Sequence, residues 1–478
     1  MSGFDLRAAA RNVAMEHGFV VDAAADALAP LPLAALGAGA RDERGLLWSS
    51  IDNQDTRDLD QLEVAERLPD GSILVKLAVA DVDVYVAKDS PLDRRAAANT
   101  TSVYTGIETF PMLPEGLSTD LTSLAEGATR AALVVEMSVG TDGRVGKTDV
   151  YRALVCNRAK LTYENVGAWL AGAAPAPTAV VATPALAEQL RMQDEAACRL
   201  RELRHERGAL DLETIEARTV TANGRVVDIA LVHKTRARDL IEDFMIAANV
   251  AVATFLETRG IASLRRVVKA PKRWPRIVAL AAREGTTLPA EPDAKALAAF
   301  LAARRAAAPD RFADLSLAVV KLMGAGEYDV EVPGGEQHGH FGLAVDDYTH
   351  STAPNRRYAD LVTQRQLKAA IAGAPSPYDA AALETIAERC TRMEDEARRV
   401  EREVRKMAAA ALLAPRVGES FDAVVTGDTP QGVFVRLLHP PAEGRVVRGE
   451  RGLDVGDRTR VTLLATDPAK GHIDLARA

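Results

Sequence analysis

Residues 51–63, IDNQDTRDLDQLE, hold four aspartates within nine positions and a single basic residue, Arg57. The four are Asp52, Asp55, Asp58 and Asp60. Carboxylates this close repel one another, so a folded chain brings them together only around a counter-charge. The next residues form two apolar runs around Pro-Asp-Gly at 69–71, a pattern typical of a β-hairpin. We therefore expect the aspartates in a loop that leads into a sheet.

Three of these aspartates are candidate ligands of a hard cation. In a loop, Asp52, Asp58 and Asp60 can point at one centre, and Mg²⁺ prefers oxygen ligands of this kind. Two such ions about 4 Å apart can hold the attacking and leaving oxygens of a phosphodiester. The same residues also fit a solvated acidic loop or a structural Ca²⁺ site, so this stretch alone leaves the function open.

A second group of functional side chains lies in residues 340–361, HFGLAVDDYTHSTAPNRRYADL. Arg356, Arg357 and Tyr358 stand there at the start of a predicted helix. Guanidinium groups bind phosphate oxygens through paired hydrogen bonds and stabilise charge that develops on a transferred phosphoryl group. Taken singly, such arginines are more often surface ion-pair partners. Together with the aspartates, they indicate phosphodiester chemistry.

A third feature is basic. Residues 264–276, LRRVVKAPKRWPR, carry six positive charges, Arg265, Arg266 and Lys269 among them, and no acidic residue. A strip of this kind follows the backbone of single-stranded nucleic acid, although a solvated basic loop is the alternative interpretation. The net charge of −8 argues against a protein that coats nucleic acid nonspecifically, but it is compatible with a local basic channel.

The periodicity of apolar residues divides the chain into three parts, 1–45, 46–415 and 416–478. The first part forms short helices, the second of which starts with residues 21–29, and they make either a helical cap or a helix-turn-helix. The middle part mixes strands with helices, which we expect near 185–215, 236–258, 355–371 and 378–413, and it includes a second hairpin that turns at Asn223 and Gly224. The last part holds five short strands with glycine turns, typical of an OB-type barrel. The predicted fold class is α+β.

The composition is that of an ordinary globular protein from a reducing compartment. Its three cysteines, Cys156, Cys198 and Cys390, are odd in number and far apart, which fits a cytoplasmic location. The N-terminus lacks an apolar signal core. The uncharged run 169–187 contains three prolines and predicts a linker or surface loop rather than a membrane span. We expect a cytoplasmic monomer with no membrane partner.

The order and spacing of these motifs resemble those of the ribonuclease II and ribonuclease R (RNB) exoribonucleases over about residues 46–415. DNQDTRDLDQ is similar to the family's D-x-x-D-A-R-D-x-D-D, and LTYENV, ERGALDLET, LIEDFMIAANVAVA and HFGLAVDDYTHSTAPNRRYADL follow in the family's order. The last part resembles the S-one type RNA-binding OB domain of family members. The resemblance implies an RNB catalytic domain of mixed sheet and helices, with a small helical N-terminal segment and a C-terminal OB-fold β-barrel.

The resemblance also implies an activity, namely processive 3′→5′ hydrolysis of single-stranded RNA to nucleoside 5′-monophosphates with Mg²⁺. Asp52, Asp58 and Asp60 match the family's metal-site aspartates. Arg356 matches the arginine that contacts the scissile phosphate, and Tyr104 matches the aromatic residue that stacks on the terminal bases. Asp60 and Arg356 are therefore the predicted catalytic residues. Arg357, Tyr358 and the basic strip are predicted to contact RNA.

One departure concerns Gln61, which stands where the family has its fourth aspartate. A glutamine oxygen can still bind a cation, so Gln61 stays among the predicted metal residues, but one negative charge is missing. We expect a higher Mg²⁺ requirement or a preference for Mn²⁺, unless Asp55 or Glu63 supplies the charge. The competing hypothesis is a catalytically weakened RNA-binding protein on the same fold.

Further departures lie outside the aspartate stretch. Ala353 and Asn355 are milder changes in the motif that usually reads T-S-P-I-R-R-Y, and both arginines remain. Only about 45 residues precede the predicted catalytic domain, so we expect no cold-shock domain there. A DNA-binding regulator built on the N-terminal helices is less favoured, because residues 1–45 are not strongly basic.

Overall fold

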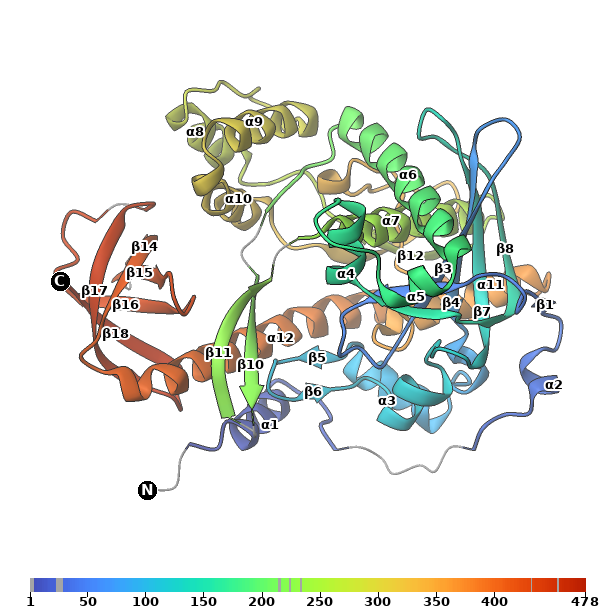
Figure 1. Ribbon diagram of the computed structural model, residues 1–478, viewed down its shortest axis with the longest axis horizontal. Coiled ribbons are helices and arrows are strands. Elements are labelled where there is room, and N and C mark those ends of the chain that lie inside the picture. The colour runs from blue at the N-terminus through green and yellow to red at the C-terminus, as the bar shows by residue number, and fades with distance from the viewer. Residues whose placement is uncertain are drawn as a thin grey trace.

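The computed structural model describes residues 4–22, 29–213, 216–222, 225–232, 234–430, 432–453 and 455–478. A seven-stranded sheet with helices on both faces makes up the largest part, and a closed barrel lies at the C-terminal end (Figure 1). This combination of a mixed sheet, helices and a small barrel is the α+β fold that the sequence predicts.

The large sheet has the strand order β1-β8-β7-β4-β3-β2-β9. The bounds are β1 Arg41–Asp42, β2 Ser49–Asp52, β3 Gln61–Arg67, β4 Ile73–Ala80, β7 Thr129–Val139, β8 Val145–Cys156 and β9 Ala159–Thr162. The central strands are antiparallel, whereas β1 and β9 run parallel to their neighbours β8 and β2. The β3–β4 hairpin turns at residues 69–71 as predicted, with Gly71 at φ +82°. This left-handed conformation favours glycine.

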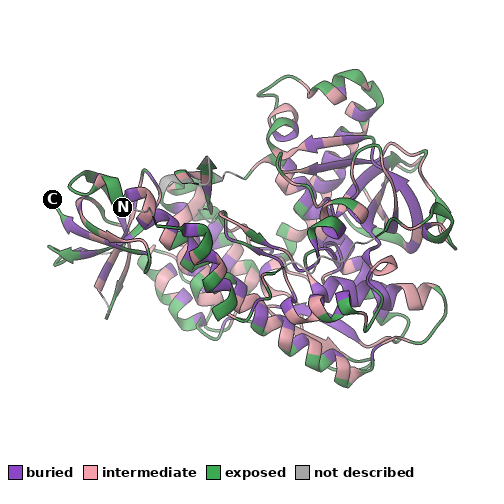
Figure 2. Cartoon of the chain, turned by 90° about the horizontal axis from the view of Figure 1, so that it is seen from below, coloured by how far each residue is buried: buried purple, intermediate pink, exposed green. Residues whose placement is uncertain are grey.

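Helices cover both faces of this sheet because its strands alternate between two apolar cores. The helices are α3 Pro91–Asn99, α4 Tyr163–Leu170, α5 Thr178–Ala182, α6 Pro184–Arg207, α7 Arg236–Glu257, α11 Tyr358–Ile371 and α12 Ala380–Leu413. Val75 and Leu77 of β4 pack toward α6 and α7. Ala78 and Ala80 of the same strand pack toward α3, α11 and α12. Figure 2 shows the strands and the inner sides of these helices as the main buried regions.

The 34-residue helix α12 connects the sheet to the barrel. Its C-terminal residues Ala409, Ala410 and Leu413 belong to the apolar core of the barrel. The barrel strands are β14 Ser420–Thr429, β15 Gly432–Leu437, β16 Glu443–Arg448, β17 Arg458–Asp467 and β18 His472–Arg477, and the barrel is closed. Its five strands match the predicted OB-type architecture.

The N-terminal helix α1, Leu6–Glu16, lies along α12. Its Ala10, Val13 and Ala14 pack against Val400 and Val404 of α12. This arrangement is a helical cap on α12. The predicted second helix around residues 21–29 falls largely on 23–28, which lie outside the described residues, and a short helix, α2, follows at Leu33–Leu36.

Smaller elements complete the middle part. They are β5 Val103–Tyr104, β6 Thr109–Phe110, β10 Glu216–Ala222, β11 Arg225–Val232, β12 Ser263–Val267, β13 Glu327–Glu331, α8 Trp274–Arg283, α9 Ala294–Ala307 and α10 Pro309–Met323. The β10–β11 hairpin is antiparallel as predicted, and its expected turn residues, Asn223 and Gly224, lie outside the described residues. Within the described ranges, none of the helices has both the length and the apolar run needed to cross a membrane.

Candidate metal and RNA site

The aspartate loop connects two neighbouring strands of the large sheet. Strand β2 ends at Asp52, and β3 begins at Gln61. The antiparallel register pairs Ser49 with Glu63. Continuing that register brings Asp52 and Asp60 toward each other at the strand ends, with the rest of the aspartates in the loop between them. The prediction of a loop leading into a sheet is therefore confirmed.

Asp60 is the most buried of the predicted ligands, with 4% of its surface exposed. Its Oδ1 accepts hydrogen bonds from the backbone N of Asn355 at 3.3 Å and from Asn355 Nδ2 at 3.0 Å. Its Oδ2 lies 3.5 Å from Arg356 Nε. Burial raises the pKa of Asp60 to about 7, Arg356 opposes that rise, and the charge of Asp58 adds to it. At neutral pH a proton and a cation therefore compete for this carboxyl group.

Asp52 and Asp58 belong to the same electrostatic cluster. Asp52 Oδ1 accepts hydrogen bonds from the backbone N of Asn53 at 2.6 Å and from Thr56 Oγ1 at 2.9 Å. The pKa of Asp52 is raised, first by burial and further by the charge of Asp58. A bound divalent cation would offset the excess of negative charge around these groups. Their oxygen donors fit Mg²⁺ or Mn²⁺, which binds carboxylates and water.

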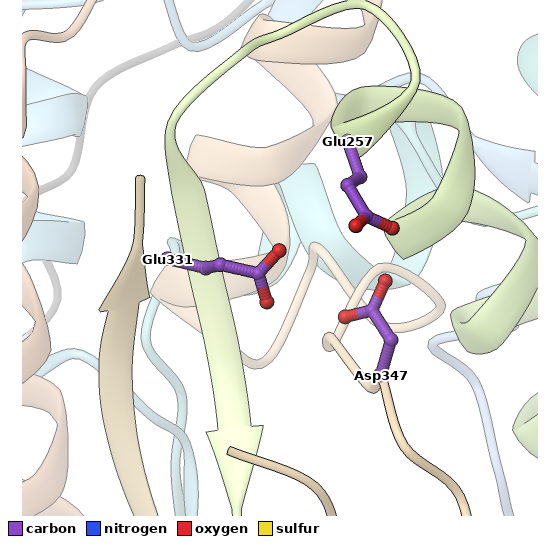
Figure 3. Close-up of side chains that lie close together, drawn as sticks. All are labelled: Glu257, Glu331 and Asp347. Atoms are coloured by element: carbon purple, nitrogen blue, oxygen red, sulfur yellow. The ribbon is translucent and has the colours of Figure 1, made fainter. Parts of the chain in front are cut away.

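The carboxylates of the loop are less tightly gathered than those of another acidic group. In the described ranges, the acidic side chains that bring three ligand atoms within 4.8 Å of one another are Glu257, Glu331 and Asp347 (Figure 3). They extend toward one another from the end of α7, from β13 and from the segment before α11. Asp52, Asp58 and Asp60 stand farther apart, as expected for like charges with a single arginine nearby.

The Glu257 group already contains a counter-charge. Arg265 Nε lies 3.0 Å from Glu331 Oε2 and 2.5 Å from Asp347 Oδ1. The side chain of Arg265 is only 2% exposed. Arg265 is paired with Glu331 and Asp347, so its position gives no support to the predicted contact between Arg265 and RNA.

Arg356 and Tyr104 lie together beside the aspartates. The carbonyl oxygen of Arg356 accepts a hydrogen bond from the backbone N of Ser102 at 3.0 Å, which joins the segment before α11 to the residue that precedes β5. The Tyr104 hydroxyl donates to Asp58 Oδ2 at 3.3 Å. Burial of this hydroxyl, followed by the charge of Asp58, raises the pKa of Tyr104, although the residue as a whole is 43% exposed. Tyr104 thus presents part of its ring to solvent while its hydroxyl reaches the acidic cluster.

A cavity of about 1030 Å³ opens at this point, and Asp58 and Tyr104 form part of its wall. The wall also contains five arginines from distant parts of the chain, namely Arg7, Arg57, Arg218, Arg238 and Arg405. They come from α1, the aspartate loop, β10, α7 and α12. Three of these arginines form ion pairs with carboxylates of the same wall, namely Arg7 with Glu108, Arg57 with Glu115 and Arg218 with Asp55. The wall is therefore of mixed charge, with guanidinium groups and an exposed ring side by side.

The other predicted RNA-binding residues lie elsewhere. Arg357 Nη2 donates to Asp360 Oδ1 at 2.7 Å. Burial lowers the pKa of Arg357, but the charge of Asp360, the hydrogen bond to it and the nearby tyrosines together outweigh burial, and the net shift is upward. Tyr358 is 6% exposed and belongs to the core between the sheet and α11. Both residues hold α11 in place instead of lining the cavity.

Two of the six basic residues of the strip, Arg265 and Arg266, are internal as well, because all five residues of β12 are buried. Arg266 Nη1 lies 2.8 Å from Glu394 Oε2 of α12, and the side chain of Arg266 is 8% exposed. Lys269 is at the surface, 2.6 Å from Glu327 Oε1, where it borders a second cavity of about 590 Å³. Arg265 and Arg266 therefore contribute ion pairs to the fold. The other four basic residues of the strip are exposed, namely Lys269, Lys272, Arg273 and Arg276.

Sequence reasoning missed two groups of this site. Asn355, which the sequence presents only as a mild departure, donates to Asp60, and its own Oδ1 accepts from Thr122 Oγ1 at 2.6 Å. Arg238 of α7 lies 4.5 Å above the Tyr163 ring, and its Nη2 donates to Asn53 Oδ1 at 2.6 Å. The motif LIEDFMIAANVAVA, which begins two residues after Arg238, is the one signal that points to this part of α7.

The chain has the architecture of a large α+β domain joined to a small OB-type barrel, and sequence profiles assign both parts. The RNB domain profile matches residues 40–373, and the profile of the RNase II-type exonuclease C-terminal S1 domain matches residues 419–478. The chain belongs to the RNB family.

Individual proteins agree with this assignment. Ribonuclease R of Thermotoga maritima is 33% identical over 85% of this chain and 58% of its own length. The chain spans about half the length of the curated relatives it matches. The structure of Mycoplasma genitalium RNase R in complex with ribose-methylated single-stranded RNA matches with a TM-score of 0.88 at 22% identity, over 99% of this chain and 78% of that chain. Yeast Ssd1, a pseudonuclease, matches with a TM-score of 0.71 at 20% identity, over 92% of this chain and 55% of that chain.

Proposed function

We propose that this chain is a divalent-metal-dependent exoribonuclease that processively degrades single-stranded RNA from its 3′ end to nucleoside 5′-monophosphates. The observation that carries the proposal is the cluster of Asp52, Asp58 and Asp60 with Arg356, beside a cavity that Tyr104 borders. The fold by itself does not distinguish an active nuclease from an inactive one, because a pseudonuclease shares it. The retained carboxylates and arginine are what favour hydrolysis.

The acidic residues would hold Mg²⁺, or Mn²⁺, with Gln61 as a neutral oxygen donor. A divalent ion at this position supplies Lewis-acid polarisation of the phosphate and a more acidic bound water. The chain itself supplies the charges that hold the ion. Asn355 keeps the Asp60 carboxylate oriented through two hydrogen bonds, and it favours the ionised form that a cation requires.

Arg356 and Tyr104 would act on the RNA. Arg356 is 45% exposed and lies next to Asp60, so its free guanidinium nitrogens can reach a phosphate beside the metal ligands. Donors placed there stabilise negative charge as it develops on the phosphate. The exposed part of the Tyr104 ring offers a surface on which a terminal base stacks. Together these two residues would position the last phosphodiester bond of a strand.

The proposed partner of the chain is single-stranded RNA, and the proposed setting is a monomer in the cytoplasm. The arginines of the cavity wall supply charge for the RNA backbone, and the C-terminal barrel supplies a second RNA-binding surface. Because the arginines come from segments far apart in sequence, RNA binding depends on the assembled fold.

The deciding experiment is incubation of the purified chain with 5′-end-labelled single-stranded RNA and Mg²⁺, followed by gel electrophoresis and analysis of the released products. We expect progressive shortening from the 3′ end and nucleoside 5′-monophosphates. Asp60→Asn is the matched inactive control. Binding of RNA by the wild-type chain with no shortening at any Mg²⁺ or Mn²⁺ concentration would favour the competing hypothesis of a catalytically weakened RNA-binding protein.

A further inference from the structure

Lys160 is a partly buried cation that binds neutral oxygens of the aspartate loop. It belongs to β9, the strand beside β2. Its Nζ donates to the carbonyl oxygen of Thr56 at 2.6 Å and to that of Gln54 at 3.3 Å. These two backbone groups are the partners of its ammonium group among the described residues, and neither is a carboxylate. Lys160 therefore fixes the path of the loop and leaves the acidic side chains of the loop unoccupied.

The sheet places Lys160 on the same face as Asp52. Strands β2 and β9 run parallel, and Ile51 of β2 and Leu161 of β9 both pack into the core shared with α6 and α7. Because side chains alternate along a strand, their neighbours Asp52 and Lys160 point to the opposite face. The ammonium group thus lies under the loop that leaves β2 at Asp52.

Thr56 links Lys160 to Asp52. The carbonyl oxygen of Thr56 accepts from Lys160, and its hydroxyl donates to Asp52 Oδ1 at 2.9 Å. The backbone N of Asn53 donates to the same oxygen at 2.6 Å, and the backbone N of Thr56 donates to the carbonyl oxygen of Asn53 at 3.2 Å, which closes a turn. In the described part of the chain, no hydrogen bond reaches Asp52 Oδ2. One oxygen of this carboxylate is therefore fixed in place, and the other is available to a cation.

We propose that Lys160 is a positioning residue for the metal site, which holds Thr56, and through it Asp52, in the orientation that binds a divalent cation. The inference rests on the proposed function, because it requires a cation at Asp52. Without a metal ion, the carboxylates of the loop repel one another and favour an open loop. Lys160 opposes this opening from below, since its charge is spent on carbonyl groups. It is not among the residues that line the cavity of about 1030 Å³, so a direct contact with RNA is not part of this role.

Lys160 affects metal binding in two ways that have opposite signs. Its positive charge repels a cation, so removal of the charge alone should tighten metal binding. Its hydrogen bonds keep the loop in shape, and loss of a group that orients a metal ligand typically weakens metal binding by about 10- to 100-fold. The sign of the change in affinity therefore separates a positioning residue from a nearby charge.

The test measures Mn²⁺ binding by isothermal titration calorimetry in the absence of RNA, with wild type, Lys160→Met, Thr56→Val and the double variant. We expect Lys160→Met to weaken Mn²⁺ binding by at least about tenfold and Thr56→Val to weaken it as well. The double variant should bind no more weakly than the weaker single variant, because both residues act through one chain of contacts. Thr56→Ser keeps the hydroxyl and should retain the wild-type affinity. Lys147→Met is the matched control, because Lys147 is an exposed lysine of β8.

Two results would overturn the inference. One is unchanged or tighter Mn²⁺ binding by Lys160→Met, whatever its melting temperature, which would show that Lys160 acts only as a charge or as a support of the fold. The other is unchanged binding by Thr56→Val, which would break the link to Asp52 and does not depend on whether Lys160→Met folds. Failure of the proposed function has a different signature, since the wild-type chain would then bind Mn²⁺, lose affinity in both variants and leave RNA intact.

Discussion

Asn355 donates two hydrogen bonds to the Asp60 carboxylate, one from its backbone N at 3.3 Å and one from Nδ2 at 3.0 Å. Both bonds favour the ionised form of Asp60 and oppose the effect of burial on its pKa. The contact joins the segment before α11 to the end of the aspartate loop, 295 positions away in the sequence. Asn355 is therefore a positioning residue for the proposed metal site.

The first prediction concerns this contact. Asn355→Ala removes the Nδ2 donor and leaves the backbone bond, so the pKa of Asp60 should rise further. We expect the rate at neutral pH to fall by about tenfold, since a lost hydrogen bond to a charged group costs about 1.5–3 kcal/mol. The acidic limb of the pH–rate profile should move to higher pH. A lower rate with an unmoved pH profile would show that Asn355 has a purely structural role.

Asp60→Asn separates RNA binding from chemistry. The amide keeps the shape of the side chain and removes the charge that a cation needs, so we expect less than about a tenth of the wild-type rate. RNA affinity, measured by fluorescence anisotropy, should stay within a few-fold of wild type, because the arginines of the cavity wall are untouched. Activity above that level would show that Asp60 is not central to the metal site.

The raised pKa of Asp60 also predicts how stability depends on pH without metal. Its folded-state pKa of about 7 lies above the ordinary value of about 3.9 for an unfolded chain. Between these values the folded state binds more protons, so the free energy of unfolding should fall as pH rises, by at most about 1.4 kcal/mol per pH unit. The Asp60→Asn variant lacks this contribution.

The measurement is urea unfolding of both proteins in EDTA across this pH range. The wild type should lose stability relative to Asp60→Asn as pH increases, and added Mg²⁺ should offset the loss above neutral pH. A difference between the two proteins that does not change with pH would contradict the assigned ionisation of Asp60.

Arg356 should affect the rate far more than binding. Removal of a donor aimed at developing charge typically costs about 10²–10³ in rate. We expect Arg356→Ala to lower the maximal rate by that amount with little change in RNA affinity. Arg94→Ala, which removes an exposed arginine of α3, is the control and should behave like wild type. Rate and affinity that fall in proportion would make Arg356 a binding residue only.

Local patterns in the sequence predict much of this fold. The apolar alternation around residues 69–71 indicates the β3–β4 hairpin, and the helical period of residues 236–258 indicates α7 almost to its bounds, Arg236–Glu257. Both patterns reflect burial of one face of an element, which neighbouring residues determine. The aspartate loop is predictable for the same reason, because it directly precedes the β3 strand.

Contacts between distant segments are what the sequence does not reveal. The charges of Arg265 and Arg266 suggest a surface strip, but Glu331, Asp347 and Glu394 neutralise them inside the fold. Those partners lie 65 or more positions away in the sequence, and no local pattern links them. The burial of Glu63 likewise depends on the packing of a whole sheet face. Its position in the sequence suggests only that it could supply the negative charge that Gln61 lacks.

The last prediction concerns the sugar of the substrate. The proposed site would bind the 3′-terminal nucleotides between Tyr104 and the metal ligands, and the 2′-hydroxyl is the group by which a protein tells RNA from DNA at a given position. We expect an RNA whose last few nucleotides carry deoxyribose to be degraded much more slowly than the all-ribose strand. A 3′-phosphate should slow degradation as well, because it adds negative charge beside Asp58 and Asp60. A strand with deoxyribose at its 5′ end only is the control and should be shortened at the normal initial rate. Equal rates on single-stranded DNA and RNA would refute the assignment of a ribonuclease, whereas slow degradation confined to the 3′-modified strands would locate the discrimination at this site.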